Sequence, residues 1–193
     1  MRFEYAPGAT PIDLGEAAGL IPAHLTLQRE LNEYEEANIL EGSDWLFARR
    51  RGDPLEERFI HLAHRRMFNQ TWRWAGRPRR SNKNIGVPWV EVPARLRQMV
   101  GDVRAQIQYE AYSPVEIAAR YHHRLVAIHV FPNGNGRHAR LMADLLVMRL
   151  GGDRLSWGSA NLQDAGSVRQ RYIAALHAAD DHDIGPLLTF ARS

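Results

Sequence analysis

The stretch HVFPNGNGRHAR, residues 129–140, places a loop of glycine and asparagine between a histidine and two arginines. Arg137 and Arg140 fall in the predicted first turn of a helix, where free N–H groups already carry partial positive charge and disfavour cations. An anion at this helix end would offset that placement and accept charge-assisted hydrogen bonds from both arginines, which lie on one face. The stretch therefore predicts a polyphosphate site between two helices.

The loop of this stretch has the properties of a ligand cradle. Gly134 and Gly136 allow positive φ and let a ligand approach the backbone closely. His129 ends the preceding helix at the mouth of the predicted site, where it can take a proton from an incoming hydroxyl as a general base. Two simpler alternatives are a histidine that only caps a helix C-terminus and arginines that only form surface ion pairs. The three features together favour the catalytic site.

Length and composition limit the class of protein. The chain has 193 residues, 45% of them hydrophobic, which suits one domain with a small appendage. A formal net charge of +3 is too weak by itself to indicate nucleic-acid binding. The absence of cysteine excludes disulfides and thiolate metal sites. The first residues lack a signal-peptide pattern, and no apolar run approaches the roughly 18 residues of a membrane helix, so we expect a soluble, cytoplasmic protein without membrane contact.

Apolar residues recur at helical spacing along most of the chain. They predict helices within residues 22–50, 54–72, 93–111, 113–129, 137–152, 161–183 and 184–193. Gly42 is expected to end the first helix, and Ser113 followed by Pro114 has the signature of an N-cap. The helix over 137–152 is apolar on most sides, which predicts a buried, central position. Residues 82–92 are rich in β-formers and predict a short hairpin, so the fold class is an all-α bundle with one β-hairpin.

The opening stretch resembles the Fic motif, which reads His-x-Phe-x-(Asp/Glu)-Gly-Asn-Gly-Arg-x-x-Arg. The matching positions are His129, Phe131, Gly134, Asn135, Gly136, Arg137 and Arg140. Residues 64–79 and 121–129 are similar to the parts of Fic proteins that precede the flap and the motif. The resemblance implies a Fic domain over residues 45–193, preceded by an N-terminal arm and helix over residues 1–44. This N-terminal part resembles the mobile mystery protein B subset, which implies a toxin-like protein of a mobile element.

The resemblance implies a protein adenylyltransferase that moves AMP from ATP to a Ser, Thr or Tyr hydroxyl of a target protein. The predicted hairpin would be the family's flap, which holds the target by strand addition. The flap residues are then Lys83, Asn84, Ile85, Gly86, Val87, Trp89 and Val90. The other implied roles are a general base (His129), a loop anchor (Phe131), a cradle for the α-phosphate (Gly134, Asn135, Gly136) and partners of the β- and γ-phosphates (Arg137, Arg140).

One position departs from the family pattern. The acidic residue that binds Mg²⁺ in the family is Asn133 here, and a neutral amide oxygen is a weaker ligand for this ion than a carboxylate. The Mg²⁺ that accompanies ATP would then be held mainly by the phosphates. The departure leaves three other functions open: a kinase or other phosphate-ester transferase on the same scaffold, a catalytically idle nucleotide-binding regulatory module, and a DNA-associated accessory factor.

Many Fic proteins are inhibited by a helix with the pattern (Ser/Thr)-x-x-x-Glu-(Gly/Asn), whose glutamate pairs with the second arginine of the motif and blocks the γ-phosphate. Thr26 and Glu30 have this spacing, but Leu31 follows in place of Gly or Asn. Glu30 is therefore a candidate inhibitory residue, with a solvated helix face as the alternative. A separate antitoxin or DNA-binding regulator encoded alongside is another candidate for control, and the sequence is also compatible with a homo-oligomer.

Other polar clusters carry weaker signals. One set matches no strong metal motif and is expected to be a solvated helix end: His177, Asp180, Asp181, His182 and Asp183. A basic set beside the flap is expected to be a solvated loop, with target or nucleic-acid contact as the alternative: Arg77, Arg79, Arg80 and Lys83. His61 and His64 are expected on a helix face rather than as metal ligands. Of the neighbours His122 and His123, at most one can face the site.

Overall fold

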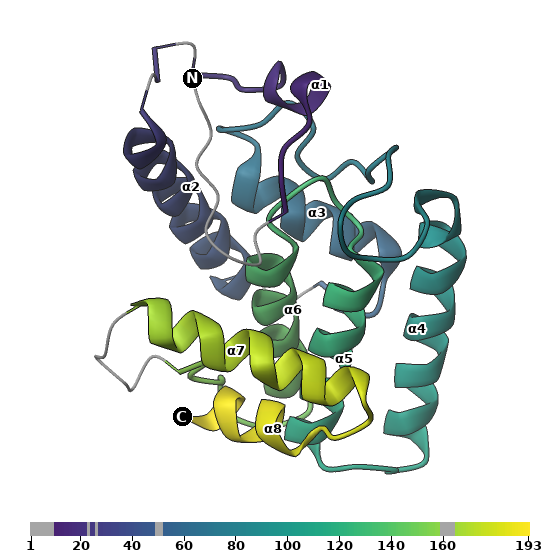
Figure 1. Ribbon diagram of the computed structural model, residues 1–193. Helices are drawn as coiled ribbons and strands as arrows, with labels where there is room; N and C mark the ends of the chain where they lie inside the picture. Colours follow the sequence, from purple (N-terminus) through teal and green to yellow (C-terminus); the bar gives the residue numbers. More distant parts are fainter. Residues whose placement is uncertain (1–9, 23, 26, 49–51, 159–164) are drawn as a thin grey trace.

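The computed structural model describes residues 10–22, 24–25, 27–48, 52–158 and 165–193, and in these ranges the chain folds into helices (Figure 1). The helices are α1 (Leu14–Ala17), α2 (Gln28–Ala48), α3 (Glu57–Phe68), the 3₁₀ helix η1 (Trp89–Glu91), α4 (Val92–Gln108), α5 (Pro114–Ile128), α6 (Asn135–Arg149), α7 (Ala165–Asp180) and α8 (Gly185–Arg192). The described residues form no strand, which confirms the predicted all-α class. None of the helices within these ranges is long and apolar enough to cross a bilayer.

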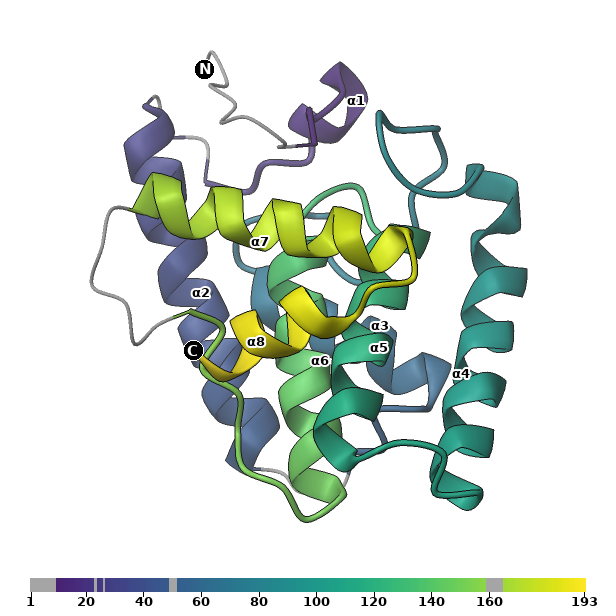
Figure 2. The same cartoon turned by 60° about the horizontal axis from the view of Figure 1, so that its bottom comes forward.

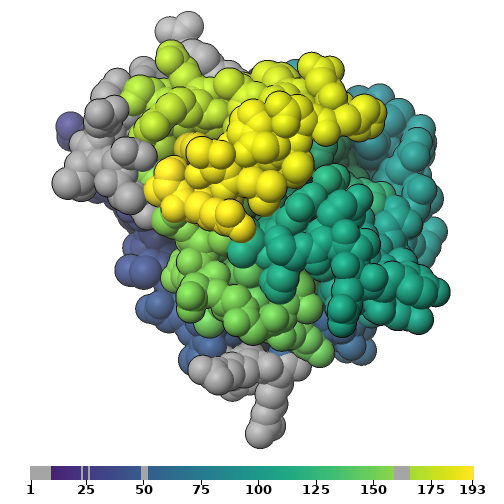
Figure 3. Space-filling model, turned by 90° about the horizontal axis from the view of Figure 1, so that it is seen from below, coloured from purple at the N-terminus to yellow at the C-terminus, as the bar shows by residue number. Residues whose placement is uncertain are grey.

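Helix α6 lies at the centre of the bundle, with other helices on several sides (Figures 1 and 2). Leu141, Met142 and Leu146 belong to an apolar core that α6 shares with α2, α3, α4 and α5. Ala143 and Val147 belong to a second core shared with α7 and α8. The predicted buried position of this helix is therefore confirmed. Figure 3 shows the underside of the molecule, where α8 lies against α5.

The helix pair α5 and α6 carries the sequence motif on its connecting loop. Helix α5 begins at the predicted cap, because the Ser113 hydroxyl accepts a hydrogen bond from a backbone N–H of the first turn at 3.3 Å. It ends in His129, which has a left-handed backbone with a φ of 56°. Helix α6 begins at Asn135 instead of the predicted Arg137, because Gly134 takes the N-cap position with a φ of 76°.

Helix α2 continues through Gly42, where the sequence predicts its end, and finishes at Ala48. The glycine allows α2 and α3 to cross closely, since a Cβ at this position would lie 2.5 Å from the backbone oxygen of Arg66. Gly42 belongs to a buried stripe along α2 at helical spacing, which consists of Leu31, Glu35, Asn38, Gly42 and Leu46. A glutamate therefore lies on the face of α2 that packs against the bundle.

Residues 82–88, hereafter the flap loop, are irregular, and the β-hairpin predicted over residues 82–92 is not found there. Side chains bind the backbone groups that a neighbouring strand would bind in a hairpin. Asn82 Oδ1 accepts a hydrogen bond from the Trp89 N–H at 3.0 Å, and the Arg79 guanidinium donates to the Val87 carbonyl. The proline before η1 lacks the N–H that a β-ladder requires.

The described N-terminal segment over residues 10–22, hereafter the arm, contains α1. The part that precedes α1 runs beside the loop between α5 and α6 (Figure 1). An isolated antiparallel bridge between Leu20 and Trp72 fixes its C-terminal end, and the Ile21 N–H donates to the Thr71 carbonyl at 2.9 Å. These contacts hold the arm, which is far from the motif in the sequence, close to the motif loop.

Candidate active site

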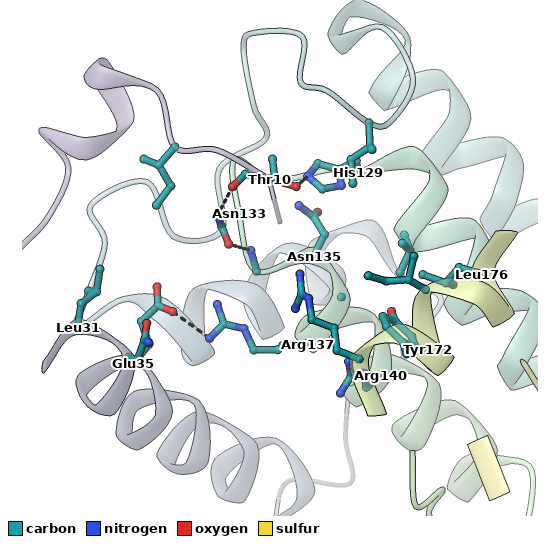
Figure 4. A pocket seen from close by; sticks show the side chains of 18 of the residues that line it. Thr10, Leu31, Glu35, His129, Asn133, Asn135, Arg137, Arg140, Tyr172 and Leu176 are labelled. Atoms are coloured by element: carbon teal, nitrogen blue, oxygen red, sulfur yellow. Dashed lines mark hydrogen bonds and ion pairs between the residues drawn. The ribbon is translucent and has the colours of Figure 1, made fainter. Parts of the chain in front are cut away.

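A cavity of about 460 Å³ lies where the arm, the first half of α2, the α5–α6 loop, the start of α6 and helix α7 meet (Figure 4). Most residues predicted for the site line this cavity: His129, Asn133, Gly134, Asn135, Gly136, Arg137 and Arg140. Of the flap residues, Ile85 lines it. The cavity is also lined by residues that the sequence did not indicate, among them Thr10, Glu35, Arg169 and Tyr172.

Phe131 and His64 support the motif loop from within the core. Phe131 is fully buried, and its ring stacks on the His64 imidazole with the two centroids 3.7 Å apart. His64 Nδ1 accepts the Gly76 N–H at 3.0 Å, so Nε2 carries the ring proton and donates to the Asn133 carbonyl at 3.0 Å. Burial holds the pKa of His64 well below its usual value, which keeps the ring neutral for both contacts. The sequence indicated only a helix face for this residue.

Asn135 closes the motif loop on itself. Its Oδ1 accepts the Phe131 N–H at 2.9 Å and its Nδ2 donates to the Phe131 carbonyl at 2.8 Å, in a buried position. The side chain thus shapes the cradle. Gly134 needs its positive φ, and a Cβ there would lie 2.5 Å from the Phe68 ring. Gly136 is more open toward the cavity, since the nearest atom to its ideal Cβ is the Tyr172 hydroxyl at 3.4 Å.

The two motif arginines differ in their partners. The Arg137 Nη1 lies 2.9 Å from Glu35 Oε2, and the other Glu35 oxygen accepts the Trp72 indole N–H at 2.6 Å. The Arg140 guanidinium lies over the Tyr172 ring, 4.5 Å from its centroid. Within the described part of the chain, no carboxylate pairs with Arg140 and its buried Nε has no hydrogen-bond partner. Arg140 is therefore the more available cation for an incoming phosphate.

Glu35, and not the predicted Glu30, is the acidic residue of α2 that reaches the motif, and it pairs with Arg137 instead of the second motif arginine that the inhibitory pattern implied. The Glu30 carboxylate accepts the Leu27 N–H at 3.0 Å at the start of α2, and the residue does not line the cavity. Thr26, the other half of the predicted pattern, lies outside the described residues. Glu35 falls on the same buried stripe as Leu31, and an acidic residue on the inward face of a helix was the signal that could have identified it.

His129 lies at the mouth of the cavity and is 3% exposed. Burial, with the nearby charges of Arg79 and Lys83 as smaller causes, lowers the pKa of His129 to about 4. The imidazole is therefore neutral at neutral pH and has a lone pair available for a proton. Its Nε2 lies 3.3 Å from the Thr10 hydroxyl, while Nδ1 has no hydrogen-bond partner among the described residues.

Two members of the basic set beside the flap are buried, contrary to the expected solvated loop. Arg79 is 2% exposed and donates to the carbonyl oxygens of His129 at 2.6 Å and Ser81 at 2.8 Å. The Lys83 side chain is also 2% exposed and binds acidic side chains of the arm. Arg77 and Arg80 are exposed, as predicted. Arg79 therefore fixes the backbone at His129, and Lys83 fixes the arm.

Asn133 uses both ends of its amide. Its Oδ1 accepts the Gly134 N–H at 2.6 Å, and its Nδ2 donates to the Thr10 carbonyl at 3.0 Å. The one neutral oxygen that could bind Mg²⁺ is thus committed to the loop. No group of three or more His, Cys, Asp or Glu suited to a metal ion occurs in the described ranges. The residues present do not fit a protein-held Mg²⁺ site, and Asn133 instead joins the motif loop to the arm.

The far end of the cavity is apolar and is bounded by α5 and α7. Val126, Ile173 and Leu176 line it, beside Tyr172. His122 Nε2 lies 3.0 Å from the Tyr172 hydroxyl, and burial lowers the pKa of His122 to about 3, so this histidine is a neutral support for the wall. This part of the wall carries apolar side chains, whereas Arg137 and Arg140 supply positive charge to the cavity.

The other weak sequence signals lie away from the cavity. His123 points outward, with its Nε2 2.7 Å from Asp180 Oδ1, and His122 is buried behind Tyr172, so neither of the two adjacent histidines lines the cavity, where the sequence allowed at most one. His177 is exposed at the end of α7, where its Nδ1 lies 3.6 Å from Asp180 Oδ2. The polar cluster near the C-terminus is therefore a helix end in solvent.

Residues 54–147 match the sequence profile of the Fic/DOC family, a range that runs from just before α3 through most of α6 and contains the motif loop. The chain contains a Fic/DOC family domain. Within this Fic domain lie the proposed base, the cradle and both arginines, whereas Thr10 and Glu35 come from the N-terminal segment and Tyr172 from α7.

The Fic domain is similar to known proteins in sequence and in fold. Protein adenylyltransferase fic-1 of Caenorhabditis briggsae is 30% identical over 119 residues, which are 60% of this chain but only 22% of that protein. The solved Fic-1 of C. elegans is 26% identical with a TM-score of 0.66, covering 93% of this chain and 52% of that one. BepC of Bartonella tribocorum, solved with bound AMPPNP, has a TM-score of 0.68 at 17% identity, covering 93% and 97% of the two chains.

Proposed function

We propose that this Fic domain transfers AMP from ATP to a Ser, Thr or Tyr hydroxyl of a protein. The observation that carries the proposal is the neutral His129 imidazole beside the helix N-terminus and arginines at one end of the cavity. Such an arrangement offers a base and an anion site within one cavity. The names of the curated relatives, which are protein adenylyltransferases, support the same reaction.

The cavity suggests how ATP would be oriented. The phosphates would lie over the first turn of α6, whose N–H groups have no partner within the helix. Arg140 would bind the outer phosphates, and Arg137 would join it once its ion pair with Glu35 opens. The adenine ring would occupy the apolar end near Val126 and Leu176. His129 Nε2 would then face the α-phosphate and the hydroxyl that attacks it.

The flap loop and the adjoining η1 are the proposed contact for a target protein. Ile85, Trp89 and Val90 are 43%, 42% and 64% exposed, which is unusual for side chains of this size. We propose that an extended target segment pairs with this loop by strand addition, and that the loop adopts strand geometry in the complex. Control by a separately encoded antitoxin or DNA-binding regulator stays a prediction from the sequence.

Labelled ATP tests the proposed reaction. The full chain is incubated with a cell lysate and ATP, labelled either at the α- or at the γ-phosphate. Label retained from the α-phosphate supports AMP transfer, and His129→Ala should reduce it by about 10²- to 10⁴-fold. His123→Ala is the matched control, because its ring points away from the cavity. Label retained only from the γ-phosphate would identify a kinase and refute AMP transfer.

A catalytically idle nucleotide-binding module is the second candidate. It is favoured by the Arg137–Glu35 ion pair and by Asn133 in the position of the family's acidic residue. Calorimetric titration separates the candidates. ATP binding without retained label from either phosphate, in the presence of a broad set of target proteins, would favour the idle module.

A further inference from the structure

The arm is held across the mouth of the active site by a buried lysine. Lys83 Nζ lies 2.8 Å from Asp13 Oδ2 and 2.6 Å from Glu16 Oε2, and it donates to the Pro11 carbonyl at 3.3 Å. The Ser81 hydroxyl donates to Asp13 Oδ2 at 3.0 Å. These bonds fix the residues that follow Thr10 to Ser81 and to the start of the flap loop.

Thr10 is itself fixed from the other side of the cavity. Its carbonyl accepts the Asn133 amide at 3.0 Å, and its hydroxyl lies 3.3 Å from His129 Nε2 (Figure 4). Thr10 is only 8% exposed, and it lines the same cavity as Gly136 and Arg140. A hydroxyl of the chain thus occupies the place that the proposed reaction requires of a target hydroxyl.

We propose that Thr10 is an acceptor of AMP, so that this protein adenylylates its own arm in an intramolecular reaction. The inference rests on the proposed function and adds the identity of one acceptor. Lys83, which lies outside the motif, and Asn133, which departs from it, position this acceptor.

The reaction balances with ATP as the only other reactant. The Thr10 Oγ1 attacks the α-phosphorus, the bond between that phosphorus and the oxygen bridging to the β-phosphate breaks, and pyrophosphate leaves. The hydroxyl proton passes to His129 Nε2, which lies within reach of it. The product is a phosphodiester between Thr10 and AMP.

The anchoring of the arm favours the reaction within one chain. A hydroxyl that is already held beside the base and the phosphate site reacts without a bimolecular encounter, and such positioning is worth effective concentrations far above those of a protein in solution. Thr10 also covers His129 Nε2, so a second protein gains access to the base only when the arm moves away.

Peptide mass spectrometry of the full chain after incubation with ATP tests the proposal. We expect the peptide that contains Thr10 to carry one adenylyl group, and Thr10→Val to remove it completely. Thr10→Ser keeps the hydroxyl and should remain modified. Thr189→Val is the matched control, because its hydroxyl binds the Gly185 carbonyl on α8 and does not line the cavity. The first-order rate constant should stay constant over about a hundredfold dilution, as an intramolecular reaction requires.

Mixing distinguishes transfer within one chain from transfer between chains. A His129→Ala chain of different mass is incubated with the active chain, and its Thr10 should remain unmodified. Modification of Thr10 in this inactive copy would overturn the intramolecular step. Label from the α-phosphate on lysate proteins or on other residues, with Thr10 unmodified, would overturn this inference alone. The absence of α-label from every protein would instead refute the proposed function, and this inference with it.

Discussion

At position 133, an amide nitrogen takes the place of a carboxylate oxygen, and this one atom changes what the side chain can bind. The amide nitrogen donates to the Thr10 carbonyl, whereas a carboxylate at the same place would set two acceptors against each other. The residue that departs from the family pattern is therefore the one that joins the motif loop to the arm. Asparagine at this position binds the arm over the site, whereas the acidic residue of the family would be a ligand for a metal ion.

The substitution Asn133→Asp should loosen the arm. Loss of one hydrogen bond and the new repulsion should speed amide hydrogen exchange of residues 10–21 by about tenfold, which corresponds to roughly 1.4 kcal/mol. Modification of Thr10 should fall, while transfer to other proteins should rise. Asn69→Asp, which adds the same charge at an exposed position at the end of α3, is the control. Unchanged exchange in the arm would show that the Asn133 contact does not hold it.

The low pKa of His129 determines how the reaction should depend on pH. The neutral ring is the active form, and it persists down to a pKa of about 4. The rate at saturating ATP should therefore stay level from about pH 8 to about pH 5 and decline only below that. Single-turnover rates, measured where circular dichroism shows the chain still folded, give this profile. A half-maximal rate near about pH 6.5 would mean that His129 titrates like an exposed histidine.

Helix α2 connects the N-terminal segment to the phosphate site through Glu35. The carboxylate is held by the Trp72 indole on one oxygen and by Arg137 on the other, so it neutralises an arginine that ATP would use. In the proposed orientation of ATP, a triphosphate would have to displace this carboxylate, whereas a shorter phosphate chain would not reach Arg137. We therefore expect α2 to make the affinity for a nucleotide depend on its number of phosphates.

Replacing Glu35 with glutamine should strengthen ATP binding. The amide oxygen can still accept the Trp72 N–H, but the charge on Arg137 becomes available to the nucleotide. We expect Kd for ATP to fall by about tenfold and Kd for AMP to change little. Calorimetric titrations of both nucleotides measure this, with the exposed neighbour Glu36→Gln as control. Equal changes for ATP and AMP would contradict the assignment of Arg137 to the outer phosphates.

The close crossing of α2 and α3 leads to a prediction about the stability of the fold. Gly42→Ala places a methyl group 2.5 Å from the Arg66 carbonyl oxygen and should destabilise the fold by about 1–3 kcal/mol. Gly101→Ala, in the exposed part of α4 with nothing within 4 Å of its ideal Cβ, should instead stabilise by about 0.5–1 kcal/mol. Urea unfolding of both variants measures whether the free energy of unfolding falls or rises. A neutral Gly42→Ala would show that the helices separate easily there.

At the scale of the whole molecule, four histidines are buried in the described part of the chain: His64, His122, His129 and His138. Burial lowers the pKa of His122 and of His138 to about 3. In the unfolded chain each ring titrates near its usual value of about 6.5. Below that pH the unfolded chain binds protons that the folded chain does not, so acid favours unfolding.

The free energy of unfolding should therefore fall as the pH falls from about 6.5 toward 3. Each buried histidine contributes a slope of up to about 1.4 kcal/mol per pH unit until its folded pKa is reached. Urea unfolding at several pH values measures the slope. His138→Gln should make it shallower, whereas His177→Gln, whose side chain is 75% exposed, should not. Equal stability at about pH 7.5 and about pH 5 would contradict the prediction.

The sequence predicts the local features of this fold well. The cap at Ser113, the central helix and the glycine loop depend on residues within a few positions of one another, and all three occur. The start of α6 was misplaced by two residues because Gly134 serves as N-cap with a left-handed backbone. The hairpin was wrong because Asn82 and Arg79 bind backbone groups that strand pairing would require.

The contacts that complete the site could not be predicted in the same way. Thr10 and His129 are 119 residues apart, and His64 reaches a carbonyl 69 residues away. The spacing of residues along the chain contains no information on such distant pairs. For the same reason, the sequence pattern indicated Glu30 as the residue that reaches a motif arginine, whereas Glu35 does so. Lys83 was assigned to the flap from the resemblance, but its partners are acidic side chains of the arm, which only the packed chain brings together.

The order of the arm and the motif along the chain has a consequence for protein synthesis. The arm leaves the ribosome first, and at about 5–20 residues per second the motif loop follows roughly ten seconds later. The α5–α6 pair forms from neighbouring residues and folds quickly once it has emerged. The arm is therefore already present when the motif loop takes shape, so a newborn chain can cover its own candidate site before it meets another protein.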